Sequence, residues 1–169
     1  MAKHFNITGE LTQELLAPGD NVIVTSILLT NTDPTHTGIV DLYIEKKFTG
    51  KFYLLKTVKI PPGVSLSSKL TGFNNNKSEF GLYIKLTKTT TVTLTGSIDP
   101  AASTTVPGSG TAFLSEVSIG DELVVSSETR IVTAIASDTS LTVDSAFSDN
   151  SNDTSPDINP VAPIDVILT

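Results

Sequence analysis

The chain of 169 residues contains no cysteine and no tryptophan, and aromatic residues make up only 6% of it. Without cysteine it can form no disulfide, no thiol nucleophile and no cysteine-ligated zinc site. No apolar run reaches the length of about 20 residues that a membrane-spanning helix needs. The first residues, Met1 to Asn6, also lack the hydrophobic core of a secretory signal. With so few aromatic residues, the interior must be built mainly from Val, Ile and Leu.

Motifs for catalysis or cofactor binding are equally scarce. The two histidines, His4 and His36, lie near the start of the chain and in a polar turn, without a carboxylate at catalytic spacing. This placement favours solvated loop residues over a general base or a metal ligand. No serine lies in a Gly-x-Ser-x-Gly elbow, and Gly108-Ser109-Gly110 lacks the lysine and the following helix of a phosphate-binding loop. We therefore expect a protein that is not an enzyme, with no catalytic residue, no cofactor and no bound metal.

One polar segment allows a calcium hypothesis. Asp and Ser alternate from Asp149 to Asp157, and oxygen ligands at alternate positions can surround a calcium ion. The turn glycine and the final glutamate of an EF-hand loop are missing, so the composition favours a linker over 149–159.

The strongest structural signal is the stretch from Asp41 to Ile60, two runs of strand-forming residues separated by a turn at Thr49-Gly50. Apolar and polar residues alternate in both runs, which predicts a hairpin with one face for a core and one for solvent. Further strand patterns cover 5–9, 22–30, 64–70 and 80–86. Residues 10–16 could form a helical turn by propensity, but the neighbouring strand patterns favour a strand.

The composition changes at Thr91, where Tyr and Lys give way to Ser, Thr, Gly, Ala and Asp. Short strand patterns at even spacing (92–98, 108–113, 123–126, 131–136 and 141–143) predict a small barrel or a compact two-sheet module. The apolar final strand, 164–169, matches the first region better than the second. We therefore predict an all-β protein: an antiparallel, jelly-roll-like β-sandwich (1–90 plus 160–169), with a β-barrel-like acidic module (91–148) and a linker (149–159) inserted before its last strand.

The net charge of −7 is unevenly distributed. Residues 1–90 hold ten lysines against seven acids, whereas 91–158 hold one cation against ten acids. This asymmetry predicts a contact with a neighbouring copy or a particle through one of two surfaces: a docking surface of Lys46, Lys47 and Lys51, or an acidic surface of Glu116, Asp121, Glu122 and Glu128. The alternatives are an ordinary acidic surface and lysines that protect a sheet edge. A pI of about 4.6 argues against a nucleic-acid partner.

Two sets of segments resemble known families. Residues 7–11, 22–31, 41–44, 51–56, 80–84 and 165–169 resemble virion structural proteins of tailed bacteriophages, especially those of cyanophages and related marine phages. Residues 93–96, 108–113, 119–123 and 129–143 resemble a small β module that recurs in phage tail, fibre and other particle proteins. These families have no catalytic residues that could be transferred to this chain.

The resemblance implies a non-enzymatic virion protein, made in the host cytoplasm, that decorates or cements the phage head through its sandwich. The implied partners are further copies of the chain and other phage structural proteins (capsid, neck or tail), without nucleic acid or membrane. A neck or tail accessory protein is the alternative within this class. A carbohydrate- or receptor-binding module is another alternative, but sugar sites usually need exposed aromatic rings. Tryptophan is absent, and the three tyrosines all lie in strand patterns.

Overall fold

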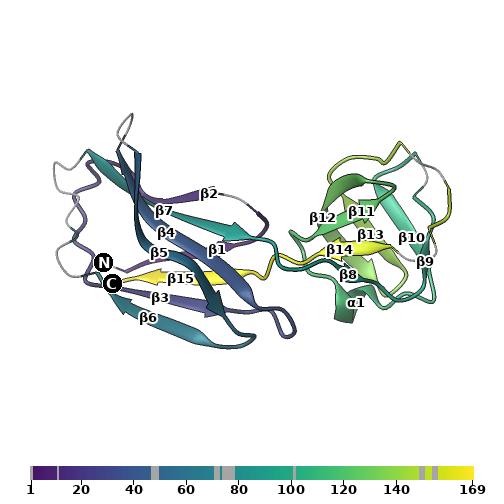
Figure 1. Ribbon diagram of the computed structural model, residues 1–169, viewed down its shortest axis with the longest axis horizontal. Coiled ribbons are helices and arrows are strands. Elements are labelled where there is room, and N and C mark those ends of the chain that lie inside the picture. The colour runs from purple at the N-terminus through teal and green to yellow at the C-terminus, as the bar shows by residue number, and fades with distance from the viewer. Residues whose placement is uncertain are drawn as a thin grey trace. The chain divides into compact units, whose positions relative to one another are not determined.

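The computed structural model describes residues 2–10, 12–46, 50–70, 73, 79–100, 102–148, 151–153 and 156–169. The structure is 57% strand and 3% helix, and the strands pair in antiparallel fashion. The chain divides into two compact units, each with its own sheets (Figure 1). Unit 1 comprises Met1–Thr87 and Ala162–Thr169, and unit 2 comprises Lys88–Val161. Unit 1 is thus discontinuous in sequence, with unit 2 between its last two strands.

Unit 1 is a sandwich of two four-stranded sheets. One sheet has the order β1-β15-β3-β6 and the other has the order β2-β7-β4-β5. Because β15 is the eighth strand of this unit, the two orders are those of a jelly roll, in which the chain passes repeatedly from one sheet to the other. The strands are β1 (Lys3–Ile7), β2 (Thr12–Leu16), β3 (Ser26–Asn31), β4 (Gly38–Lys46), β5 (Gly50–Ile60), β6 (Ser65–Lys69), β7 (Phe80–Thr87) and β15 (Ile164–Leu168).

The core of unit 1 follows from the alternation of side chains along its strands. On β15, Ile164, Val166 and Leu168 are buried while the residues between them are half-buried. Buried residues of the same spacing come from β7 and from β4, mostly Leu, Ile and Val. The antiparallel β-sandwich predicted from the sequence is therefore confirmed. The long apolar run 22–30 forms a shorter strand than predicted, since β3 begins only at Ser26.

A buried polar cluster fixes the corner between β3 and β4. Asn31 Nδ2 donates to the carbonyl oxygens of His36 (2.8 Å) and Ile60 (2.9 Å), and Asn31 Oδ1 accepts the N–H of Asp33. Burial acts to raise the pKa of the Asp33 carboxyl, but hydrogen bonds from the backbone of His36 and Thr35 outweigh it, so the pKa lies below its usual value. Asp33 Oδ2 also lies 3.3 Å from His36 Nδ1. The expectation that neither histidine has a carboxylate at catalytic spacing was therefore wrong for His36.

Unit 2 is built on a seven-stranded sheet with the order β8-β14-β11-β12-β13-β10-β9. An isolated bridge pairs Ile98 of β9 with Asp153, just before β14, so the sheet curls back towards its first strands in the barrel-like manner predicted. A hydrophobic core surrounds the buried Phe113. The elements are β8 (Val92–Thr93), β9 (Ser97–Ile98), β10 (Thr105–Ser109), α1 (Phe113–Glu116), β11 (Glu122–Val125), β12 (Glu128–Ser137), β13 (Ser140–Val143) and β14 (Asp157–Asn159).

Three predictions within unit 2 need correction. The run 92–98 is broken into β8 and β9 by Gly96, which has φ +81° and lies so close to β10 that a Cβ there would meet Ser109 O at 2.5 Å. Phe113 begins α1 and does not extend a strand. The linker predicted over 149–159 includes β14, because Asp157–Asn159 pair with both β11 and β8.

Candidate binding surfaces

The predicted acidic surface is divided among internal contacts. Asp121 is fully buried, and its carboxylate accepts the N–H groups of Ser118 (2.8 Å) and Val161 (2.7 Å). A buried carboxylate satisfied by backbone donors stabilises the fold and presents no charge to a partner. Asp121 is therefore excluded from a contact surface.

The other three acids are also engaged within unit 2. Glu116 accepts hydrogen bonds from Thr95, while Glu122 binds Lys88 (2.8 Å) and Asn159. Glu128 pairs with Arg130 and also accepts from Ser148. These three carboxylates hold neighbouring segments together, and their part in an acidic contact surface stays a prediction.

The predicted lysine surface is only partly described. Lys46 forms an ion pair with Glu79. Lys51 Nζ donates to the Tyr43 hydroxyl (3.2 Å) and lies 4.4 Å from the centre of that ring. The hydrogen bond to Tyr43 raises the pKa of Lys51. Lys47 lies outside the described residues, so its part in a docking surface stays a prediction.

All three tyrosines lie in one row across a sheet of unit 1. The pairing places Glu14 of β2 beside Tyr83 of β7, Tyr83 beside Tyr43 of β4, and Tyr43 beside Tyr53 of β5. The Tyr43 and Tyr83 rings are nearly parallel, with centres 5.8 Å apart, and the Tyr53 ring is tilted, 5.5 Å from Tyr43. Cross-strand aromatic neighbours of this kind stabilise a sheet, and they also line up their rings on one face.

Gly81 allows the Tyr83 ring to lie close against the sheet. A Cβ at Gly81 would meet Tyr83 Cε2 at 2.8 Å and Leu16 O at 2.9 Å, so no larger residue fits below the ring. The Tyr83 hydroxyl donates to Glu14 Oε2 (2.8 Å). Burial, with the Glu14 carboxylate as the next cause, raises the pKa of Tyr83 to about 12. The Tyr83 ring therefore packs directly over the backbone of Gly81, and the Glu14 carboxylate fixes the position of its hydroxyl.

A hollow of about 470 Å³ opens over these rings. We call it the tyrosine hollow; it is lined by Thr12, Pro18, Tyr43, Glu45, Lys51 and Tyr83. Glu45 and Lys51 are directly paired across β4 and β5, so the hollow carries a carboxylate and an ammonium group side by side. The sequence held a signal for this site: Leu42-Tyr43-Ile44 and Leu82-Tyr83-Ile84 have the same pattern, which places both tyrosines on the face opposite the core.

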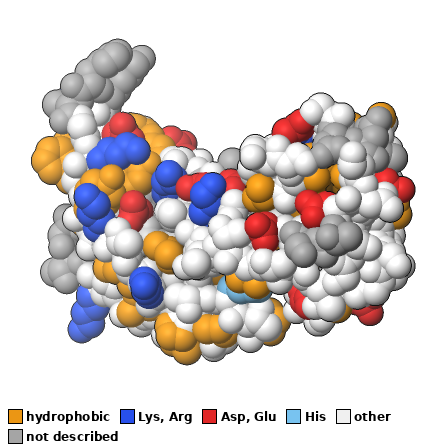
Figure 2. Space-filling model, turned by 45° about the vertical axis from the view of Figure 1, so that its right-hand side comes forward, with side chains coloured by type: hydrophobic (Ala, Val, Ile, Leu, Met, Phe, Trp, Pro, Cys, Tyr) orange, Lys and Arg blue, Asp and Glu red, His pale blue; other side chains and the backbone are white. Residues whose placement is uncertain are grey.

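The outer strand β5 presents a second surface. Phe52, Tyr53 and Leu54 are 54%, 43% and 40% exposed, and lysines flank them at Lys51 and Lys56. We call these five residues the β5 surface. Figure 2 shows lysine side chains beside hydrophobic ones on unit 1. Neighbouring residues of a strand point to opposite faces, so Lys51 and Tyr53 lie against Tyr43 on one face of β5, and Phe52 lies against Phe80 on the other.

The backbone of β5 is poorly suited to pairing with another strand. The register between β4 and β5 shifts twice, between Val40 and Leu42 and between Leu42 and Tyr43. Thr57 lies within the first irregularity with φ +52°, a conformation that β-branched residues rarely adopt, and its N–H donates to Asp41 Oδ1 (2.6 Å). Bulges and lysines are the usual means by which proteins protect a sheet edge against strand addition. Contacts at β5 therefore depend on its side chains.

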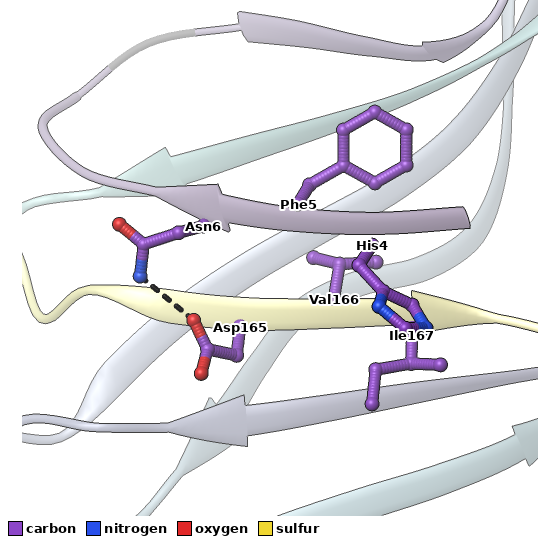
Figure 3. A pocket seen from close by; sticks show the side chains of 6 residues that line it. All are labelled: His4, Phe5, Asn6, Asp165, Val166 and Ile167. Atoms are coloured by element: carbon purple, nitrogen blue, oxygen red, sulfur yellow. Dashed lines mark hydrogen bonds between the residues drawn. The ribbon is translucent and has the colours of Figure 1, made fainter. Parts of the chain in front are cut away.

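A smaller hollow of about 290 Å³ lies over β1 and β15 (Figure 3). The Asn6 amide donates to Asp165 Oδ1 (2.7 Å), and His4 pairs with Ile167 across the same two strands. Phe5 points to the other side of β1, as strand alternation requires (Figure 3). The ionisable side chains that line this hollow are His4 and Asp165, and Asp165 is already hydrogen-bonded to Asn6. We therefore do not consider it further as a functional site.

The described part of the chain contains no cluster of three or more His, Cys, Asp or Glu residues that could hold a metal ion. In the segment considered for calcium, Asp157 accepts a hydrogen bond from Thr93, and the backbone of Asp153 pairs with Ile98. Asp149 and Ser155 fall outside the described residues. Nor does any described helix have the length and apolar character needed to cross a membrane.

The chain matches no protein-family model, no curated protein and no solved structure.

Proposed function

We propose that the chain is a non-enzymatic structural protein of a tailed-phage particle, which docks on the head as a decoration or cement protein through the β5 surface of unit 1. Support comes from the sequence resemblance described above. The jelly-roll order of unit 1 is compatible with this role, because jelly rolls occur in viral capsid proteins. They also occur in lectins, and a fold by itself does not define a function.

The observation that carries the proposal is the combination found on β5. The strand exposes three successive large hydrophobic side chains, of which Phe52 and Tyr53 point to opposite faces, while bulges and lysines protect its backbone. An edge whose backbone resists strand addition while Phe52 and Leu54 stay exposed favours docking through side chains onto a preformed surface. The flanking lysines fit a partner surface with apolar residues surrounded by carboxylates.

Of the four predicted acids in the acidic module, Asp121 is buried and the other three already accept hydrogen bonds or form ion pairs within unit 2. We therefore place the docking partner on the particle shell. Within the same class, a neck or tail position is the alternative to the head.

Two measurements test this function. Immunogold labelling of purified particles should show the protein on the head; gold at the neck or tail would support the alternative, and absence from particles would refute the virion assignment. Rebinding to particles that lack the protein should fall about tenfold or more for the double variant Phe52→Ser/Leu54→Ser, since exposed aromatic anchors commonly contribute more than 1 kcal/mol. Val64→Ser, which removes an exposed hydrophobic side chain outside β5, is the matched control and should rebind normally.

The lysines should contribute less. Exposed ion pairs are worth about 0.2–1 kcal/mol each, so Lys51→Glu/Lys56→Glu should weaken rebinding mainly at low salt. Rebinding that is unaffected by the Phe52/Leu54 pair and abolished by the lysine pair would contradict the side-chain docking argued here.

A further inference from the structure

We propose that the free edge of β6 binds a second copy of this chain, through antiparallel strand pairing about a two-fold axis. The sheets β1-β15-β3-β6 of the two copies then form one continuous sheet. β6 is the last strand of its sheet, and no described strand pairs with its outer side (Figure 1). An edge of this kind can bond a further strand through its backbone N–H and C=O groups. This contact does not depend on docking through β5.

The pairing of β6 with β3 decides which backbone groups of β6 are free. Next to β6, the Asn31 N–H donates to Val64 O (3.0 Å), so these two residues form a hydrogen-bonded pair of the ladder. Hydrogen-bonded pairs recur at every second residue of an antiparallel ladder, which assigns the even-numbered residues of β6 to β3. The odd-numbered residues direct their N–H and C=O groups to the open side, and all of them are exposed: Ser65, Ser67 and Lys69.

The other edges of unit 1 are less suited to strand addition. β5 contains two register shifts against β4, and β2 contains one against β7. The same alternation on β1 leaves the backbone of only two residues, His4 and Asn6, facing away from β15. β6, by contrast, pairs with β3 in an unbroken register, contains no proline, and has a single charge, Lys69, at its end. It therefore lacks most of the features that protect a sheet edge.

The free groups of β6 are self-complementary. If Ser67 lies on the two-fold axis, opposite Ser67 of the second copy, then Ser65 lies opposite Lys69 of the second copy. In this register every free N–H and C=O of the three residues has a partner, because free groups meet only free groups. A shift of the register by two residues leaves one of the three residues without a partner. A two-fold axis also makes the contact closed, so that it yields a dimer and not a fibre.

The charges favour the same register. The two Lys69 side chains lie at opposite ends of the joined strands, so they do not repel each other at close range. Each extends a row on the outer face of the other copy that runs through Ser65, Thr30, Asp165 and Asn6. The charged member of that row is the carboxylate of Asp165. The lysine of one copy therefore approaches a row of opposite charge, which an arbitrary peptide strand would not be expected to match.

Engineered disulfides test the register, because the sequence contains no cysteine. Hydrogen-bonded residues of an antiparallel pair have Cα atoms about 5.5 Å apart, within the range that a disulfide spans. Ser67→Cys in the full chain should therefore form a disulfide-linked dimer under mild oxidation at micromolar concentration. Ser65→Cys is the matched control, since its counterpart lies four residues along the strand, about 13 Å away, and it should cross-link at least about tenfold more slowly. A mixture of Ser65→Cys and Lys69→Cys should give the mixed dimer.

Sedimentation velocity tests the association without a cross-link. The wild type should form dimers as its concentration is raised. Ser67→Pro removes an N–H that β3 does not use, and proline is tolerated on a free edge, so dimer formation should weaken about tenfold or more while amide protection of β3 and β15 persists. Ser67→Thr keeps the N–H and should associate like the wild type.

Three results would overturn the dimer. They are a wild type that stays monomeric up to millimolar concentration, equal cross-linking rates for Ser65→Cys and Ser67→Cys, and a folded Ser67→Pro variant that associates as well as the wild type. If Ser67→Pro does not fold, the cysteine variants still decide the register.

Discussion

Removal of the last strand should unfold unit 1 while leaving unit 2 intact. A chain ending at Val161 lacks β15, which lies between β1 and β3 and buries Ile164, Val166 and Leu168. Burial of a Val, Leu or Ile side chain contributes about 1.5–3 kcal/mol, so the three together contribute roughly 5–9 kcal/mol. The loss also leaves the facing edges of β1 and β3 without hydrogen-bond partners. Because a whole domain is stable by only about 5–15 kcal/mol, unit 1 cannot be expected to survive.

Amide hydrogen exchange measures this directly. In the truncated chain, protection should disappear from β1, β3 and β4 and persist in β11 to β13. Single substitutions in β15 should have smaller effects. Ile164→Ala should lower the free energy of unfolding of unit 1 by about 2–5 kcal/mol, whereas Ile167→Ala, on the opposite face of the same strand, should lower it by about 1 kcal/mol or less. Retained protection of β1 and β3 in the truncated chain would refute the reasoning, as would equal costs for the two isoleucine variants.

The converse deletion tests the discontinuous architecture. Removing 88–161 and joining Thr87 to Ala162 through a short Gly-Ser linker leaves all eight strands of the sandwich. This chain should stay folded, with the protection pattern that unit 1 has in the full-length protein. Aggregation of both the truncated and the internally deleted chains would show that unit 1 depends on unit 2 for folding.

Three further predictions concern single side chains. Phe113→Ala should destabilise unit 2 by about 3–5 kcal/mol, and loss of exchange protection in both units at once would contradict independent cores. Because the pKa of Asp33 is lowered, its carboxylate stabilises unit 1 above about pH 4, and this contribution is lost as the pH falls through the folded-state pKa. Asp33→Asn should therefore reduce the loss of stability at acid pH, measured as the free energy of unfolding in urea. The pKa of Tyr83 is raised to about 12, so Tyr83 contributes stability below about pH 10 that is lost as the pH rises towards 12. An ultraviolet titration should show a phenol that ionises near pH 12. If this ionisation persists in Tyr83→Phe, its assignment to Tyr83 is wrong.

The elements that depend on local alternation could be predicted from the sequence. The hairpin from Asp41 to Ile60 and the return of the chain to the sandwich at 164–168 both carry a clear period of two. Where local pattern and tertiary environment diverge, the prediction failed. Phe113 follows a glycine-rich strand and has good strand propensity, but the core of unit 2 draws it into a single helical turn.

The candidate sites were harder to predict, because they depend on which residues meet across strands. Asp121 has the sequence context of an exposed turn, and only the fold brings the N–H of Val161, forty residues away in sequence, to its carboxylate. The tyrosine row has the same origin: each tyrosine lies in an ordinary strand pattern, and only the order β7-β4-β5 makes the three neighbours. Charge counts along the chain could not distinguish carboxylates that face solvent from those that hold segments together.

The two faces of β5 allow the proposed docking to be assigned to one of them. Neighbouring residues on β5 point to opposite faces, so Phe52 lies towards Phe80 (ring centres 5.8 Å apart) while Lys51 and Tyr53 lie beside Tyr43. If docking uses the face that carries Phe52, Phe52→Ser should weaken rebinding to particles about tenfold, and Tyr53→Ser should leave it nearly unchanged. Lys51→Glu should then have only a small effect that disappears at high salt, because its ammonium group lies against Tyr43 on the other face. Equal losses of rebinding for Phe52→Ser and Tyr53→Ser would contradict docking through one face of β5.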